Sequence, residues 1–250
     1  ETTRLSLRKS TDGGDTFEAA VEGIDEEEDF LFITPFVMDP SNAGRLWLGG
    51  TSLWRTTDGA ASWTQASTSV AGEERRSISA IAVAAADPNR VLAGTVEGFI
   101  HRSDAALTST GATRWRRNRP AEGYVSWVAF DPVSSNVAYA TYSTFGVAHV
   151  WKTVNGGATW VPLEGEGEGR LPDVPVHAIV ADPENPAHLY VGTDLGVFSS
   201  LDGGLTWMVE NTGFANVATE SLSIRTTPDG ARYLFAFTHG RGAWRVRLDG

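Results

Sequence analysis

An eight-residue pattern that recurs four times without gaps constrains the fold of this chain more than any other feature of its sequence. In each copy a Ser or Thr is followed by an Asp-Gly or Asn-Gly pair, and then by a Thr or Ser and a large aromatic residue. The four copies span residues 10–17, 56–63, 153–160 and 200–207, and a longer, degenerate copy runs from Ser103 to Trp115. A period of roughly 47 residues is typical of solenoids and propellers.

A second motif recurs in step with the first. Asp-Pro pairs at residues 39–40, 87–88, 131–132 and 182–183 each follow an apolar run and precede a short β-rich run. Asp-Pro favours a turn because proline fixes φ and the Asp side chain bonds nearby amides. Asp-Gly between alternating runs is a strong hairpin signal. Since no segment has a helical period, each repeat is predicted to form four strands, which indicates an all-β fold of the β-propeller type.

The repeats predict a single propeller domain over residues 1–250, with about five four-stranded blades. The blades are expected near residues 30–68, 77–119, 124–163, 175–210 and 217–250. Residues 1–20 supply either a closing strand of the fifth blade or the end of another, partial blade. The sequence slightly favours the second alternative, which makes the chain a piece of a larger propeller.

The four gapless segments resemble the Asp-box, or bacterial neuraminidase, repeat. This repeat occurs in sialidases, sortilin-type receptors, xyloglucanases and photosystem II assembly factors, and the resemblance extends over nearly the whole chain. It implies a bacterial protein outside the cytoplasm, either extracellular or periplasmic, and further domains or blades in the same parent chain. It is specific for the fold and weak for function, because one scaffold supports many activities.

The repeated acidic and aromatic positions are predicted to have structural roles. Asp or Asn in these turns caps the turn amides, and the aromatic residue that follows is large enough to fill the space between neighbouring sheets. These positions are Asp12, Asp58, Asp104, Asn155, Asp202, Trp63, Trp115, Trp160 and Trp207.

Candidate ligand residues lie in the loops at the opposite rim. Glu97 and Asp194 are weak candidates for a pair of catalytic carboxylates, which a glycoside hydrolase would need. Stacking faces and hydrogen-bonding groups suited to a sugar are also present in these loops. They are Tyr142, Phe145, His149, His239 and Arg241. The alternative interpretation is that all of these are ordinary polar turn residues.

Composition narrows the choice of partners. The net charge of −11 argues against nucleic-acid binding, which needs a basic footprint. No stretch is long and apolar enough for a membrane helix, and the lack of cysteine excludes thiolate chemistry. No cofactor or metal is predicted. Calcium at the acidic segment 22–29 is a minor alternative, because the ordered ligand spacing of a known calcium loop is missing.

Three functional hypotheses remain. The first is a secreted or surface-exposed module that binds a glycan or a protein. The second is a glycoside hydrolase, sialidase-like or xyloglucanase-like, of which this chain is all or part of the catalytic propeller. The Arg-Ile-Pro segment of sialidases is missing, so the sequence leaves enzymatic activity uncertain and favours a non-enzyme. The third is an assembly factor, suggested by the basic segment 114–119.

Overall fold

The computed structural model describes residues 2–3, 5–70, 77–210, 213–214 and 216–248. Within this part the chain is almost entirely β-structure, and the helical segments are short 3-10 turns at Ala106–Thr108 and Gly167–Gly169. The prediction of an all-β fold is therefore confirmed. No described helix has the length and apolar character needed to cross a membrane.

Five antiparallel sheets follow one another along the chain, and within each sheet neighbouring strands are consecutive in sequence. The first two sheets are β5 (Phe36–Asp39), β6 (Asn42–Gly49), β7 (Leu53–Thr56), β8 (Thr64–Gln65) and β9 (Ile78–Ala84), β10 (Asp87–Thr95), β11 (Ile100–Ser103), β12 (Arg116–Asn118). The next two are β13 (Val125–Phe130), β14 (Ala138–Tyr142), β15 (Val150–Thr153), β16 (Val161–Pro162) and β17 (Val176–Ala181), β18 (Leu189–Thr193), β19 (Gly196–Ser200), β20 (Met208–Val209). The fifth has three strands, β21 (Thr219–Thr226), β22 (Arg232–Thr238) and β23 (Gly242–Arg247).

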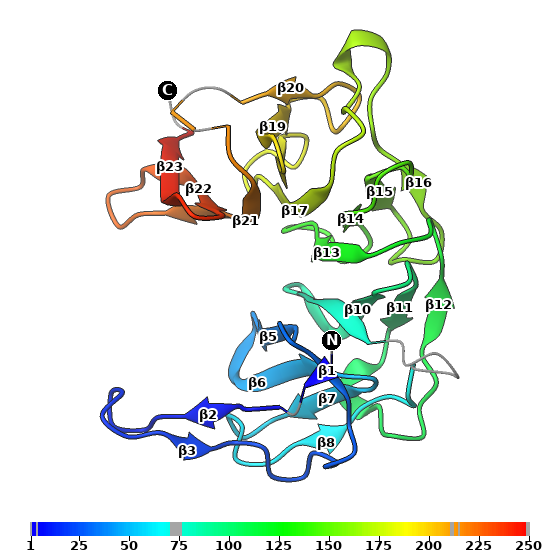
Figure 1. Ribbon diagram of the computed structural model, residues 1–250, viewed down its shortest axis with the longest axis vertical. Coiled ribbons are helices and arrows are strands. Elements are labelled where there is room, and N and C mark those ends of the chain that lie inside the picture. The colour runs from blue at the N-terminus through cyan, green and yellow to red at the C-terminus, as the bar shows by residue number, and fades with distance from the viewer. Residues whose placement is uncertain (1, 4, 71–76, 211–212, 215, 249–250) are drawn as a thin grey trace.

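The sheets are arranged around an arc, with the first strand of each sheet toward the centre (Figure 1). This is the radial arrangement of a β-propeller. The hydrophobic core is divided among the spaces between successive sheets. Trp47 and Trp115, for example, meet edge to face between the first and second sheets, with ring centroids 6.1 Å apart. Because each sheet covers only its neighbours, the repeat period of the sequence becomes the angular period of the fold.

Each Asp-Gly turn is closed by the same set of hydrogen bonds. In the fourth sheet, Ser200 Oγ donates to Asp202 Oδ1 at 2.8 Å, and the Thr206 N–H and Oγ1 donate to the two carboxylate oxygens at 2.9 and 2.6 Å. These bonds lower the pKa of Asp202 to about 2, with the Thr206 hydroxyl as the largest cause. Asp12 and Asp58 make the corresponding bonds in their own turns. In the Asn155 turn, Oδ1 accepts the same bonds from Thr153 Oγ1 and the Thr159 N–H, but the Asn155 Nδ2 donates to Thr159 Oγ1.

The degenerate turn of the second sheet is built differently. The Asp104 carboxylate lies 3.9 Å from the guanidinium groups of both Arg90 and Arg102, and a short 3-10 turn follows it. The extra residues between Asp104 and Trp115 replace the compact turn of the other copies.

The Trp after each turn joins its sheet to the chain segment before it. The indole Nε1–H of Trp63 donates to Ala20 O at 2.9 Å, and those of Trp115 and Trp207 donate to the Ala66 and Leu163 carbonyls at 3.0 Å. The fourth copy differs, because Trp160 Nε1 is buried without a partner.

At this third-sheet junction the Asn118 side chain supplies the contact that Trp160 does not make. Its Nδ2 donates to the carbonyls of Gly157 and Ala158 at 2.9 and 3.0 Å, and both carbonyls belong to the turn that precedes Trp160.

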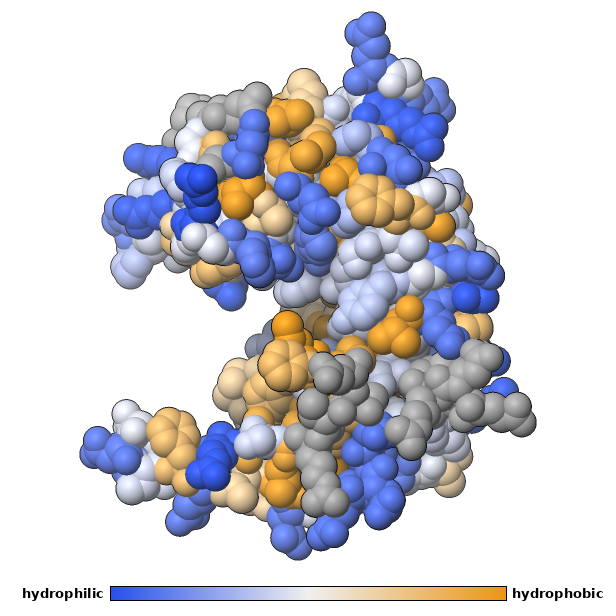
Figure 2. All heavy atoms as spheres, viewed as in Figure 1, coloured by the Kyte–Doolittle hydropathy of each residue, from blue (hydrophilic) through white to orange (hydrophobic). Residues whose placement is uncertain are grey.

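The N-terminal segment packs against the first sheet. Strands β2 (Arg8–Lys9) and β3 (Glu18–Ala19) form a hairpin around the first Asp-Gly turn, and β1 (Thr2–Thr3) pairs with β4 (Phe30–Leu31). In the described residues this hairpin is a separate two-stranded sheet. It lies across an opening from β23, and the opening is visible in both the ribbon and the space-filling view (Figures 1 and 2).

Candidate functional site

Four of the five central strands contain a β-bulge at the same level. The strand pairing shifts register between Ile78 and Ala80 of β9, and the corresponding shift recurs in β13, β17 and β21. Each shift leaves one extra residue in the central strand, and a bulge of this kind redirects the side chain of that residue. The four bulge residues are Ser79, Ser126, His177 and Glu220.

In the second and third sheets, the bulge residue ties the sheet to its neighbour. Ser79 Oγ donates to Val125 O at 2.7 Å, and Ser126 Oγ donates to Val176 O at 2.5 Å. In the fourth and fifth sheets a His and a Glu occupy the same position. Along the arc, the bulge residue therefore changes from a Ser that bonds to the next sheet to an ionisable His or Glu.

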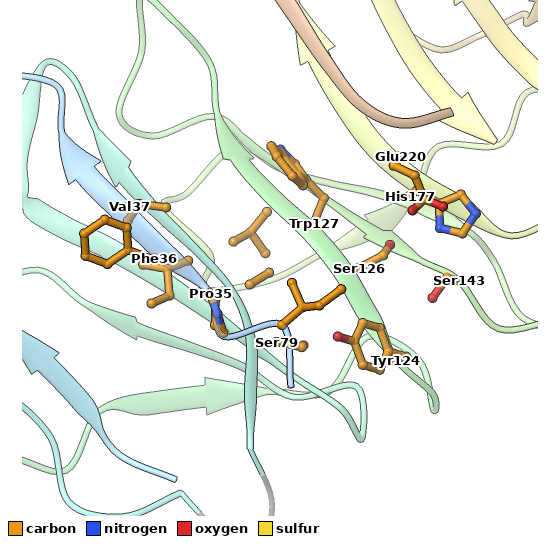
Figure 3. A pocket seen from close by; sticks show the side chains of 14 residues that line it. Pro35, Phe36, Val37, Ser79, Tyr124, Ser126, Trp127, Ser143, His177 and Glu220 are labelled. Atoms are coloured by element: carbon orange, nitrogen blue, oxygen red, sulfur yellow. The ribbon is translucent and has the colours of Figure 1, made fainter. Parts of the chain in front are cut away.

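These bulge residues line one cavity of about 330 Å³ at the centre of the arc. Figure 3 shows their side chains together with three aromatic residues, Phe36, Tyr124 and Trp127, which come from three different loops or strands. The remaining lining residues are Ile33, Pro35, Val37, Ala80, Ile81, Val128 and Ser143. The cavity thus combines apolar and aromatic walls with a few polar groups, as small-molecule sites commonly do.

The His and Glu of this cavity each have an ionisable partner. His177 Nε2 lies 2.7 Å from Asp194 Oδ1. Because a carboxylate only accepts hydrogen bonds, Nε2 carries the proton, and Nδ1 of the neutral ring is then an acceptor. Glu220 Oε1 lies 3.6 Å from His239 Nδ1. The Tyr124 phenol is a neutral donor at neutral pH, and burial raises its pKa further above the ordinary value.

The sequence-predicted residues separate into two groups in the structure. Asp194 and His239 lie beside the cavity, through their contacts with His177 and Glu220. Glu97 is not among the lining residues, so the structure does not bring it to the cavity with Asp194.

The other predicted side chains lie elsewhere. Phe145 is 63% exposed on the loop after β14, and Arg241 is exposed on the turn before β23. Tyr142 is the last residue of β14 and His149 lies just before β15, and both side chains are buried. The Tyr142 ring is fully buried, and its hydroxyl donates to Gly98 O at 2.9 Å.

His149 belongs to a second, polar pocket between the third and fourth sheets. Its ring is 2% exposed, with Nε2 3.0 Å from Asp173 Oδ1 and Nδ1 3.3 Å from Tyr142 O. Glu164 Oε1 accepts the His149 backbone N–H at 2.6 Å, and Arg170 pairs with the same carboxylate at 3.1 Å. These bonds fasten the β14–β15 loop to the following linker, so the cluster reads as a structural junction. In the described residues, no group of three His, Asp or Glu side chains is placed to hold a metal ion.

Sequence reasoning missed His177, Glu220, Tyr124 and Trp127. The available signal was a comparison of the repeats at one position. The second residue of the predicted inner strand is Ser in two repeats, and it is His177 and Glu220 in the next two. At this repeat position a small hydroxyl gives way to ionisable groups, and such a departure from the repeat indicates a candidate functional site.

Solved structures similar to this chain are β-propellers. The chain superposes on an ancestral GH74 enzyme with a TM-score of 0.63 at 20% identity, covering 86% of this chain and 30% of that chain. The GH74 xyloglucanase from Xanthomonas campestris matches with a TM-score of 0.64 at 16% identity, over 87% of this chain and 36% of that chain. The β-propeller domain of Myceliophteria thermophila Cps50 (Swd1) matches with a TM-score of 0.61 at 13% identity, over 87% of this chain and 67% of that chain.

At these identities the likeness concerns the fold, and the chain is a β-propeller module. It spans about a third of the length of the GH74 enzymes that it matches. No family model matches the chain, and no curated protein matches it in sequence.

Proposed function

We propose that this chain is an Asp-box propeller module that binds a neutral carbohydrate in the central cavity. The observation that supports this most directly is the composition of the cavity wall. Three aromatic residues, Phe36, Tyr124 and Trp127, line a cavity that also contains Glu220 and His177, and neither Lys nor Arg is among the lining residues. Aromatic rings pack on the apolar faces of sugars, while carboxylate and imidazole groups bond to hydroxyls.

The charge of the wall argues against an acidic sugar. Glu220 would repel the carboxylate of a sialic or uronic acid, and no lining cation compensates for it. The inner-strand Arg225 of the fifth sheet is not among the lining residues either. A neutral glycan is therefore the favoured ligand. The location outside the cytoplasm that the Asp-box resemblance implies is part of the same proposal.

Isothermal titration with a panel of neutral and acidic oligosaccharides tests the proposal. Tyr124→Ala removes a stacking face, and Glu220→Gln removes the charge while preserving the size of the side chain. Each is expected to weaken binding about tenfold or more, which corresponds to about 1.4 kcal/mol. Phe145→Ala and Glu168→Gln are matched controls at exposed positions away from the cavity, and both should bind as the parent does.

Three results would redirect or refute the proposal. Binding that is lost in Phe145→Ala and kept in Tyr124→Ala would move the ligand to the β14–β15 loop. Reducing-sugar release that disappears in Glu220→Gln or Asp194→Asn would make the module a glycoside hydrolase. Binding of acidic oligosaccharides in preference to neutral ones would refute the charge argument.

A further inference from the structure

The outer strand of the second sheet, β12, carries a concentration of positive charge. Four arginines occur within residues 114–119 of a chain whose net charge is −11. In the described residues β12 pairs with β11 on one side only, and it lies at the outer side of the arc (Figure 1). These four exposed residues, Arg114, Arg116, Arg117 and Arg119, form the arginine strip.

Protection of a free sheet edge does not account for the arginine strip. Charged side chains on an outer strand do discourage pairing with other chains. The outer strands of the first, third and fourth sheets, β8, β16 and β20, are terminal in the same way in the described residues. They consist of Thr64–Gln65, Val161–Pro162 and Met208–Val209, with no cation among them. Among these four sheets the strip is therefore particular to the second.

The strip also places positive charges opposite each other within the sheet. Arg116 pairs directly with Arg102 of β11, and Arg117 pairs directly with His101. Like charges at opposed positions destabilise a sheet. Burial, and after it the Arg117 charge, lowers the pKa of His101 to about 4, so this histidine is neutral at neutral pH. The pairing gives the fold no favourable charge energy, which indicates that the strip serves an interaction.

Two arginines of the strip are held in place by an aromatic ring. The guanidinium carbons of Arg117 and Arg119 lie 4.6 and 5.0 Å from the ring centroid of Phe99. Arg119 Nε also donates to Glu97 O at 2.9 Å, and its Nη1 lies 3.1 Å from Glu122 Oε1. In the described part of the chain, no other member of the strip has a carboxylate partner. A guanidinium that is already stacked loses less freedom when it binds a carboxylate.

We propose that β12 is a docking edge for an extended acidic segment of a partner protein, which adds to the second sheet as a fifth strand. The outer main-chain groups of β12 would bond to the main chain of this segment. Side chains of a strand alternate between its two faces. Arg117 and Arg119 lie on the Phe99 face and Arg116 lies on the other, so a run of consecutive acidic residues meets arginines on both faces. Each carboxylate can form two parallel hydrogen bonds with a guanidinium.

Other polyanions fit the strip less well. The strip is short, and the chain as a whole has a net charge of −11. A nucleic acid or a sulfated polysaccharide that extends beyond the strip would therefore meet repulsion. An acidic peptide segment can be confined to the strip, and it alone brings main-chain amides and carbonyls with the spacing of a strand. The charge and the free edge together favour a peptide.

Fluorescence anisotropy with a labelled octaglutamate peptide tests the charge of the site. The parent protein should bind the peptide, and added salt should weaken the binding. Arg116→Glu and Arg117→Glu should each raise the dissociation constant about tenfold or more, because an attraction becomes a repulsion. Arg241→Glu makes the same change of charge at an exposed position on the turn before β23, and it should bind as the parent does. Normal binding by both strip variants would overturn the proposal.

Thermal melting of the same variants separates binding from a structural role. Arg116→Glu puts a carboxylate opposite Arg102, so its Tm should equal or exceed that of the parent while its peptide binding is weakened. A lowered Tm together with weakened binding would assign Arg116 to the stability of the sheet and would overturn the argument that it serves an interaction.

The peptide backbone supplies an independent test of strand addition. An octaglutamate with every backbone amide N-methylated keeps its charges but has no amide donor, and it should bind about tenfold or more weakly. Equal binding of the two peptides would show adsorption by charge alone. Tighter binding of a sulfated hexasaccharide or of a single-stranded oligonucleotide than of octaglutamate would identify another class of polyanion. Either result, or a parent protein that does not bind octaglutamate, overturns the proposal.

Discussion

The Trp residues that follow the turns offer a direct measurement of one buried hydrogen bond in an otherwise repeated setting. Trp207 donates its Nε1–H to Leu163 O at 3.0 Å, whereas Trp160 Nε1 is buried without a partner. Trp→Phe at either position removes the same atoms from the same place in the repeat. We predict that Trp207→Phe destabilises the protein more than Trp160→Phe does.

The size of the difference follows from what is left behind. Trp207→Phe removes a hydrogen bond that contributes about 0.5–1.5 kcal/mol to the free energy of unfolding. It also leaves the carbonyl acceptor without its donor, which costs a further amount of about 1–3 kcal/mol. At position 160 the substitution removes a donor that already lacks a partner, which relieves a cost of the same order. Both substitutions also lose ring area, which destabilises both variants. The free energies of unfolding of the two variants should therefore still differ by at least about 1 kcal/mol.

Urea unfolding followed by circular dichroism measures this difference, and thermal melting provides a second reading. For a protein of this size, about 1 kcal/mol corresponds to a shift of roughly 2–4 °C in Tm. Trp63→Phe is a replicate with an intact donor, since Trp63 Nε1 bonds to Ala20 O at 2.9 Å. Replacing each Trp by 3-benzothienylalanine keeps both fused rings and removes only the N–H. Equal or greater destabilisation at position 160, in both series, would refute the reasoning.

Two further predictions test the turns and the core. Asp202→Asn should fold normally, as Asn155 does in the corresponding turn, but it should lose an acid transition. The depressed pKa of Asp202, about 2, means that its stabilisation is present above the ordinary carboxyl pKa and is lost as pH falls toward 2. Acid unfolding of the parent and variant should therefore converge near pH 2; curves separated by a constant amount would contradict this. Tyr142→Phe should cost about 1–3 kcal/mol in unfolding free energy, because Gly98 O loses its donor, while glycan titration should be unchanged.

The turn chemistry was predictable because it is local. All the groups that close the Asp202 turn lie within seven residues, between Ser200 and Thr206. The same holds for the Asp-Pro turns, where Asp182 accepts the Glu184 N–H at 2.9 Å. Repetition of these short motifs was therefore enough to predict all-β sheets in a radial array.

The positions of Tyr142 and His149 could not be predicted in this way. Tyr142 pairs with Val125 and Thr141 pairs with Trp127, with Ser126 as the extra residue between. The extra residue lies on β13, so Tyr142 keeps the alternation of β14 and shares the buried face of Ala138 and Ala140. The loop was expected to begin before Tyr142, yet the strand extends through it. His149 is held inside by acceptors at Tyr142 O and Asp173, seven and 24 residues away.

The cavity itself depends on the curvature of the array. His177 and Glu220 come from the bulges of different sheets, and only the arc brings them to one cavity. The sequence does show that His177 and Glu220 depart from the residue found at this position in other repeats. At the bulge the scaffold needs a small donor that reaches the next sheet, which Ser79 and Ser126 provide through bonds to Val125 O and Val176 O. His177 and Glu220 take the place of this Ser. At these two positions, the hydrogen bond that stabilises the sheet junction is thus replaced by an ionisable group that lines the central cavity.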